Sequence, residues 1–155
     1  MSETFRQLLD ESIQLELNLA KLYTAYNDLF AEDEDFWWDL AMEERGHASL
    51  LQQEKTAPQQ EPFFPENLLA TDLDALKAIN KRVLDLVAAA KSTPPSRGEA
   101  LRTAYELETS AGESHFQRFM ESPASSFAAN IFQQLNQGDR DHAERIQRYI
   151  DEQAL

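Results

Sequence analysis

Residues 44–48 read Glu-Arg-Gly-His-Ala, and residues 139–143 read Asp-Arg-Asp-His-Ala. Each stretch carries a carboxylate that is followed three residues later by a histidine. Each also follows a segment with an acidic residue among apolar ones, Glu16 in the first case and Glu108 in the second. These two acidic residues are 92 positions apart, and the two histidine-containing stretches are 95 positions apart. The spacing predicts an internal pseudo-repeat, in which each half pairs an acidic helix with a carboxylate–histidine helix.

Helical periodicity of the apolar residues extends over most of the chain. Prolines cluster at a few breaks, glycine is scarce, and the alternation typical of strands is missing. We expect a turn at residues 31–35, where acidic residues enter the second helix, and a cap for the third helix at Thr71 or Asp72. The expected helices cover residues 3–31, 34–55, 69–91, 96–121 and 124–153.

The lengths of the connections predict how these helices are arranged. The first two helices are joined tightly and should run antiparallel, as should the last two, while a long connection joins the halves. We therefore predict one all-α domain over residues 1–155, a ferritin-like four-helix bundle made of two antiparallel helix pairs. The helix at 69–91 is interpreted as an extra helix on the crossover that serves packing only.

Six candidate metal ligands fall in the middle of apolar stripes that should face the bundle core. In the first helix, for example, the stripe advances in alternating steps of four and three residues from Phe5 to Phe30, and Glu16 lies near its centre. An i, i+3 spacing puts both side chains of a pair on one helix face. The six residues are Glu16, Glu44, His47, Glu108, Asp139 and His142.

Burial of four carboxylates requires a compensating charge. An ionised carboxylate costs several kcal/mol to bury unless it is paired, and no Lys or Arg lies on the four stripes. Two divalent cations would balance the four negative charges. The pattern therefore predicts a site for two metal ions, formed by four carboxylates and two imidazoles.

Other residues on or beside the inner stripes have more than one interpretation. His115 lies two turns after Glu108 and is expected in the core or in support of the ligands. Tyr23, Tyr26 and Tyr105 could hydrogen-bond a ligand or carry an electron, although core packing is the more frequent explanation for such residues.

Three glycines inside expected helices lie near the proposed ligands, and each costs about 1 kcal/mol relative to alanine. Close approach of helices, a local π-bulge or room for an exogenous ligand would offset this cost, or the glycines have no role. They are Gly46, Gly112 and Gly138.

The composition limits the classes of function. With 28 acidic against 14 basic residues the formal charge is −14, which disfavours nucleic acid and anionic lipid and attracts cations. The absence of cysteine excludes disulfides, zinc fingers, iron–sulfur ligation and a cysteine nucleophile. The first residues lack the features of a signal peptide, and no segment approaches the roughly 18 apolar residues of a membrane span. We expect a cytoplasmic protein that binds neither nucleic acid nor membrane.

Over about residues 5–150 the chain resembles the rubrerythrin branch of the ferritin-like superfamily. The resemblance rests on the doubled pattern described above, together with Tyr23 seven residues after Glu16. Members of this family bind a di-iron centre and reduce peroxide, oxidise Fe²⁺ with O₂ or H₂O₂, or store iron. The resemblance implies two iron ions as cofactor and a small oxidant, O₂ or H₂O₂, as substrate.

The resemblance also implies roles for the six ligands. Glu16 and Glu108 would be terminal or chelating ligands, and His47 and His142 would bind one iron each. The remaining two, Glu44 and Asp139, would be bridging or semi-bridging carboxylates.

The chain departs from the family pattern in three places. Asp139 replaces a glutamate and is one methylene shorter, which affects bridging and the metal–metal distance. Ala111 stands where rubrerythrins carry an extra acidic residue, which affects the ligand switching of their peroxidase chemistry. The absence of cysteine means that no rubredoxin-like site is present, so a peroxidase activity would need electrons from a separate protein.

The leading hypothesis is a non-haem di-iron oxidoreductase of the peroxidase or ferroxidase type. One alternative is an iron storage or delivery subunit, and another is a helical binding module with a structural or vestigial metal site. Manganese is an alternative metal, because oxygen-rich sites choose weakly between these ions. The native metal, the physiological oxidant and the assembly stay open, with a homodimer among the options.

Overall fold

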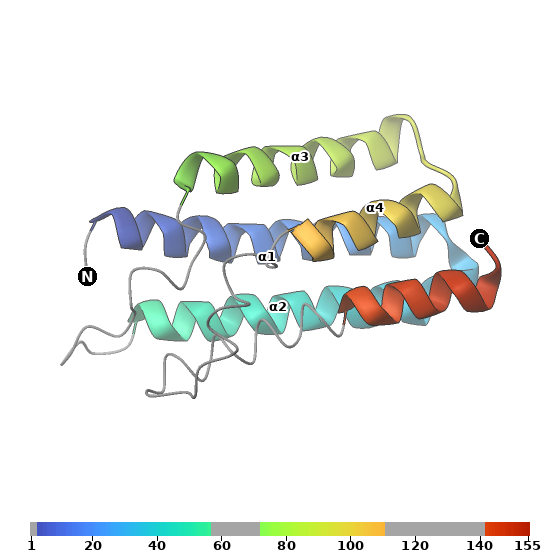
Figure 1. The fold of residues 1–155 in the computed structure, drawn as a ribbon, viewed down its shortest axis with the longest axis horizontal. Helices are drawn as coiled ribbons and strands as arrows, with labels where there is room; N and C mark the ends of the chain where they lie inside the picture. Colours follow the sequence, from blue (N-terminus) through green and yellow to red (C-terminus); the bar gives the residue numbers. More distant parts are fainter. Residues whose placement is uncertain (1–2, 57–71, 111–141) are drawn as a thin grey trace. The chain divides into compact units, whose positions relative to one another are not determined.

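The computed structural model describes residues 3–56, 72–110 and 142–155. Helices occupy almost all of these ranges, and no strand occurs in them, which confirms the all-helical class (Figure 1). The elements are α1 (Glu3–Leu29), the 3₁₀ helix η1 (Ala31–Asp33), α2 (Glu34–Thr56), α3 (Leu73–Ser92) and α4 (Arg97–Ser110), followed by a helix over residues 142–153.

The observed boundaries differ from the expected ones chiefly at the first turn. α1 ends at Leu29, and the acidic stretch expected as a turn forms η1 before α2 begins at Glu34. Glu34 and Asp35 occupy the first turn of α2, where the helix dipole favours negative charge. The remainder of the fourth and fifth expected helices, over residues 111–141, lies outside the described residues.

Two compact units make up the chain, Met1–Pro94 and Pro95–Leu155. The first unit contains α1, η1, α2 and α3, and the second contains α4 and the helix over 142–153. The single domain over residues 1–155 stays a prediction.

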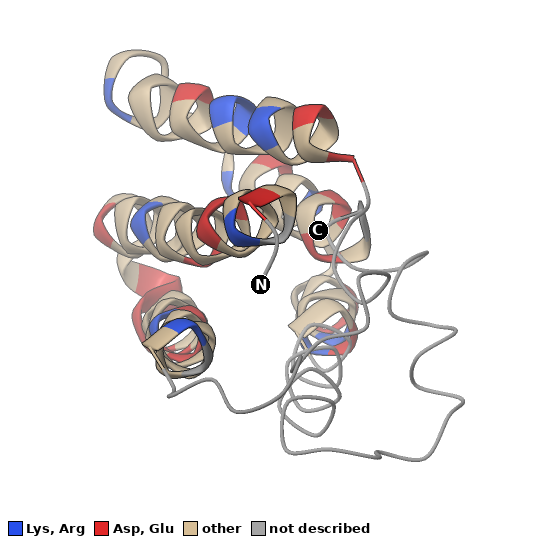
Figure 2. Ribbon diagram, turned by 90° about the vertical axis from the view of Figure 1, so that its left-hand side faces the viewer, with Lys and Arg blue, Asp and Glu red and all other residues tan. Residues whose placement is uncertain are grey.

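In the first unit α1 lies between α2 and α3 and packs against both (Figures 1 and 2). α1 and α2 form an antiparallel hairpin closed by η1 (Figure 1). Because α1 has a neighbour on two sides, it buries apolar residues around much of its circumference, and most of the core residues of this unit come from it. The buried apolar residues of α1 are Leu8, Leu9, Ile13, Leu15, Leu19, Ala20, Leu22, Tyr23 and Tyr26.

Aromatic packing closes the turn end of the α1–α2 hairpin. Trp37 of α2 is fully buried, and its ring centroid lies 5.8 Å from that of Tyr23 and 5.0 Å from that of Tyr26. Phe36 meets Trp37 edge-on at 5.3 Å. Tilted and edge-to-face rings at these distances stabilise beyond the area they bury, so this cluster anchors the start of α2.

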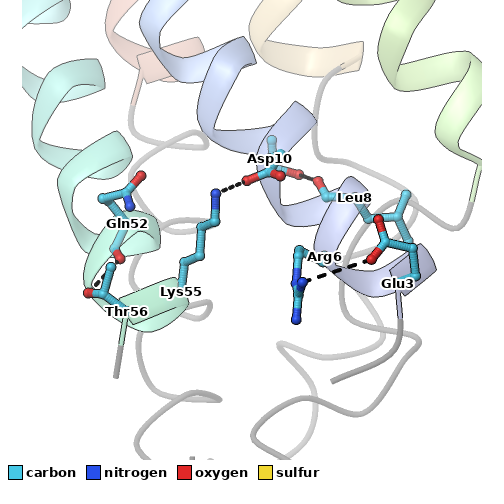
Figure 3. A network of polar contacts seen from close by, with 8 residues as sticks. Glu3, Arg6, Leu8, Asp10, Gln52, Lys55 and Thr56 are labelled. Atoms are coloured by element: carbon cyan, nitrogen blue, oxygen red, sulfur yellow. Dashed lines mark hydrogen bonds and ion pairs between the residues drawn. The ribbon is translucent and has the colours of Figure 1, made fainter. Parts of the chain in front are cut away.

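Polar contacts lie at the opposite end of the same hairpin. Lys55, in the last turns of α2, extends to the carboxylate of Asp10 on α1 and forms an ion pair with it (Figure 3). Both side chains are part-exposed, so this contact contributes little stability by itself. It joins the end of α2 to the first half of α1.

α3 begins at a capped N-terminus and packs on α1. Asp72 accepts hydrogen bonds from the backbone N–H groups of Asp74 and Ala75 at 3.0 and 3.2 Å, which confirms the expected cap at this position and contributes about 1 kcal/mol. Three apolar residues and one polar residue of this helix are buried: Leu76, Asn80, Val83 and Ala90.

The described part of the second unit contains two antiparallel helices, α4 and the helix over 142–153. At the start of α4 the Ser96 hydroxyl accepts from the Glu99 N–H, and the Glu99 carboxylate accepts from the Ser96 N–H at 2.9 Å, which is a capping box. Arg97 donates to the Tyr149 hydroxyl at 3.3 Å and to Oε1 of Gln153 at 2.9 Å. The beginning of α4 therefore lies beside the end of the last helix.

None of the helices in the described ranges has both the length and the apolar character needed to cross a lipid bilayer.

Candidate metal centre

Three of the proposed ligands meet within the first unit. α1 supplies Glu16, and α2 supplies Glu44 and His47 one turn apart. One donor atom from each residue lies within 4.8 Å of the other two. Nδ1 of His47 is 3.6 Å from Oε2 of Glu16 and 3.4 Å from Oε2 of Glu44.

These separations resemble those between donors bound to one ion. Two donors about 2.1 Å from a metal and about 110° apart lie roughly 3.4 Å from each other. The usual N–H···O hydrogen bond is shorter, about 2.7–3.2 Å between heavy atoms. The positions of the three side chains therefore suit a shared cation.

The three side chains are largely withdrawn from water. The side chain of Glu44 is fully buried, while those of Glu16 and His47 are 12% and 14% exposed. Their location follows from the helix pattern: Glu16 lies between Leu9 and Tyr23 on the buried stripe of α1, and Glu44 follows the buried Leu40 on α2.

Burial and mutual repulsion perturb the acidity of Glu16. Removal from water raises the pKa of its carboxyl well above 4.5, and the neighbouring charge of Glu44 raises it further, while His47 opposes the shift. Oε2 of Glu16 is buried and receives no hydrogen bond from any described residue. A carboxylate in this state is stabilised by a cation, which removes the repulsion and supplies the missing partner.

A second pair of proposed ligands meets within the second unit. Nδ1 of His142 lies 3.6 Å from Oε1 of Glu108 on α4, and both side chains are almost fully buried, at 2% and 1% exposed. Asp139, the third candidate of this half, lies outside the described residues, as do His115 and Ala111. Each unit therefore contains a buried carboxylate and a buried or nearly buried imidazole at matching separation.

The three tyrosines singled out in the sequence occupy different environments. Tyr23 is fully buried and packs against Trp37. Tyr105 is half-buried and lines an open pocket of the second unit together with Gln147, Arg148 and Asp151. Tyr26 is buried, and loss of water raises its pKa from 10.0 to about 12, so its phenol is neutral across the physiological range.

No described helix packs closely against Gly46, the glycine between Glu44 and His47. A Cβ placed on Gly46 would meet no described atom within 4 Å, and the residue is exposed. Among the described residues, close packing of a neighbouring helix therefore does not explain this glycine. The other two glycines near ligands, Gly112 and Gly138, lie outside the described residues.

The sequence interpretation missed a buried polar pair on the other side of α1. Asn18 is fully buried, Asn80 of α3 is 6% exposed, and the two are hydrogen-bonded at 3.0 Å. The helix at 69–91 was expected to serve packing only, yet it contributes this amide. The available signal was the position of Asn80, which follows Leu76 and precedes Val83 on the buried stripe of α3.

Comparison of the chain with protein-family models, with curated proteins and with solved structures finds no match. The function is therefore inferred from the side chains themselves. The buried carboxylates and imidazole of the first unit could hold a metal ion.

Proposed function

We propose that the chain is a non-haem di-iron carboxylate protein of the rubrerythrin-like type, which reacts Fe²⁺ with O₂ or H₂O₂. In this proposal the chain has a ferritin-like fold with α3 on the crossover between its halves. Each unit supplies one imidazole and its carboxylates, with Asp139 completing the second set. The observation that carries the proposal is the buried cluster of Glu16, Glu44 and His47, whose donor atoms lie within 4.8 Å of one another.

The donor set suits iron or manganese. Carboxylate oxygens and a neutral imidazole nitrogen are ligands that these divalent ions accept. Within the first unit, two carboxylates carry a charge of −2, which one divalent ion neutralises. This balance removes most of the cost of burying Glu16 and Glu44.

The residues of the chain have separable tasks in this proposal. Glu16, Glu44 and His47 would hold the iron, which when bound would supply one-electron redox chemistry toward the oxidant. Burial raises the pKa of the Glu16 carboxyl, so the metal-free protein holds this proton to a higher pH than a free carboxyl does, and an ion that binds would compete with the proton. The low exposure of Glu44 and His47 limits the access of bulk water to the site.

A second candidate function is a structural metal site in a helical binding module. One observation favours it: a single hairpin supplies all three donors of the first cluster. An ion held there would cross-link α1 and α2 without any redox role. This candidate predicts metal-dependent stability without turnover.

Metal content and iron oxidation together test the proposal. Tag-free protein purified without chelator should contain close to two iron or manganese ions per chain by mass spectrometry. Anaerobic Fe²⁺ loading followed by stopped-flow mixing with O₂ or H₂O₂ should give a rapid absorbance change. Glu44→Gln should abolish both results.

The adjacent Glu43→Gln is the matched control, because Glu43 is exposed on the same helix and undergoes the same chemical change. It should bind metal like the wild type. A wild-type protein that is metal-free and takes up no Fe²⁺ contradicts both candidate functions. Metal uptake without any reaction with O₂ or H₂O₂ supports the structural site instead.

A further inference from the structure

A hydrogen-bonded network centred on two buried amides, Asn18 and Asn80, joins α1 to α3. Nδ2 of Asn18 donates to Oδ1 of Asn80 at 3.0 Å, and Oδ1 of Asn18 accepts from Nε2 of Gln14 at 2.9 Å. Nδ2 of Asn80 donates to the backbone oxygen of Glu11 at 3.0 Å and to its Oε2 at 2.8 Å. Both hydrogens and the oxygen of the Asn80 amide are thus used within the interface.

This network lies on the side of α1 opposite the proposed ligand. At about 100° per residue, Glu11, Gln14 and Asn18 all fall within roughly 40° of the point directly opposite Glu16. α1 lies between α2 and α3 (Figures 1 and 2). The face that meets α3 therefore carries amides, and the face that meets α2 carries the carboxylate.

Buried amide pairs define the register of neighbouring helices more sharply than apolar contacts do. Apolar side chains tolerate sliding and repacking, whereas a buried amide that loses its partner costs about 1–3 kcal/mol. A single polar residue in an apolar seam is known to specify helix register for this reason. Three hydrogen bonds cross from Asn80 of α3 to Asn18 and Glu11 of α1, and they are satisfied together in one relative position of the two helices.

The position of α1 matters because the metal cluster is divided between two helices. Glu44 and His47 share α2, and Glu16 comes from α1. A metal–oxygen bond tolerates errors of only about 0.2 Å, while one turn of helix spans about 5.4 Å. Resting on the proposed metal function, we propose that Asn18 and Asn80 are positioning residues, which hold the face of α1 opposite Glu16 against α3 and so keep Glu16 turned toward Glu44 and His47.

The test separates positioning from stability in the full-length protein. Asn18→Leu/Asn80→Leu replaces both partners by apolar side chains of similar size, a change that is often neutral for stability. Co²⁺ is the probe, because its visible absorption reports both binding and coordination geometry. We expect roughly tenfold weaker Co²⁺ binding, at the lower end of the effect of residues that support ligands, and an altered spectrum.

Val83→Ala is the matched control at the same interface, because Val83 is a fully buried α3 residue without a polar group. It should lower the free energy of unfolding and leave Co²⁺ affinity within twofold of wild type. If circular dichroism shows that the double variant does not fold, Asn80→Ala replaces it. Asn80→Ala should lose stability as Val83→Ala does, but should lose Co²⁺ affinity as well.

Wild-type Co²⁺ affinity and spectrum in the asparagine variants would overturn the inference while leaving the proposed metal site intact. Equal loss of affinity in Val83→Ala would also overturn it, because general destabilisation would then explain the effect. Failure of the wild-type protein to bind Co²⁺ or Fe²⁺ would overturn the proposed function, and the inference with it.

Discussion

Toward α3, α1 buries amides that satisfy one another, whereas toward α2 it buries Glu16, whose Oε2 receives no hydrogen bond from the described residues. Both groups are polar, and both lie within apolar stripes of the same helix. The amides are neutral and carry donors and acceptors together. Ionised carboxylates carry only acceptors and cannot donate to each other. Burial therefore disfavours the ionised form and raises the pKa of Glu16.

This difference indicates which face of α1 has a structural role and which has a binding role. The face toward α3 is complete in the protein alone. The face toward α2 has an excess of negative charge and acceptors, which a cation would relieve. In metal-free protein, substitutions on the two faces should change the free energy of unfolding in opposite directions. Only the face toward α2 should respond to the removal of metal.

Removal of metal should have the largest effect on stability. A chelator should lower the free energy of unfolding of the loaded protein by about 4 kcal/mol if the free ion had been near a thousand times its Kd. Thermal unfolding with and without chelator measures this change. Glu16→Gln should unfold at the same temperature in both conditions, and a wild type that does the same would remove the evidence for a bound ion.

Asn80→Ala should lower the free energy of unfolding by about 1–3 kcal/mol, because Asn18 and Glu11 would each lose a buried partner. The loss should appear in metal-free protein as well, since no ion is involved on this face. Urea unfolding in the presence of chelator measures it. Lys81→Ala is the control, as an exposed neighbour on α3 whose replacement should change stability by less than about 0.5 kcal/mol.

In metal-free protein, Glu16→Gln should stabilise the fold, whereas Asn80→Ala should destabilise it. Glu16→Gln should raise the free energy of unfolding at pH 7 by about 1–3 kcal/mol, because a neutral amide removes the repulsion with Glu44 and can donate to it. The same substitution should abolish metal binding. Urea unfolding with chelator, compared with Glu43→Gln, gives the measurement, and a destabilised metal-free variant would contradict the strain assigned to this face.

The difference in the free energy of unfolding between metal-free wild type and Glu16→Gln should depend on pH, because the pKa of Glu16 is raised. The folded protein holds this proton more tightly than the unfolded chain, whose ordinary value is 4.5. The contribution of Glu16 to stability is therefore complete below about pH 4.5 and is lost as the pH rises through the raised pKa. Metal-free wild type should show this decline relative to Glu16→Gln, and parallel profiles would exclude it.

Gly46→Ala should have the smallest effect, a gain of up to about 1 kcal/mol. The added methyl would meet no described atom within 4 Å, so only the helix preference of the backbone changes. Gly98→Ala should gain less, because its Cβ would lie 3.1 Å from Nη1 of Arg102. Thermal unfolding of both variants measures the difference. Loss of metal from Gly46→Ala would show that this glycine serves the site after all.

Much of the local structure could be predicted from the chain itself. The 3.6-residue period of apolar positions predicted the helices. A cap was expected at Thr71 or Asp72, and Asp72 is the cap, since its side chain accepts from two backbone N–H groups. The i, i+3 spacing of Glu44 and His47 predicted that they share a helix face, as they do. The metal itself, the ferritin-like arrangement of the units and the redox activity stay predictions.

The role of α3 could not be predicted in the same way. The apolar stripe of α3 predicted only that the helix packs on another one. Asn80 was overlooked because no residue near it in the sequence indicates its hydrogen-bond partners. Those partners, Asn18 and Glu11, lie 62 and 69 positions away. Hydrogen bonds between distant residues depend on how helices pack, which periodicity alone does not specify.

The sequence alone determined that the described parts of this protein are helical and which residues line each buried stripe, because these depend on contacts within about one helical turn. The tertiary structure decided which polar residues on those stripes find partners. Asn18 meets Asn80 across the α1–α3 interface, and Glu16 meets Glu44 and His47 across the α1–α2 interface. Whether a buried polar group finds a partner depends on which residues the neighbouring helix places beside it. Only the packing of α1 between α2 and α3 decides which residues those are.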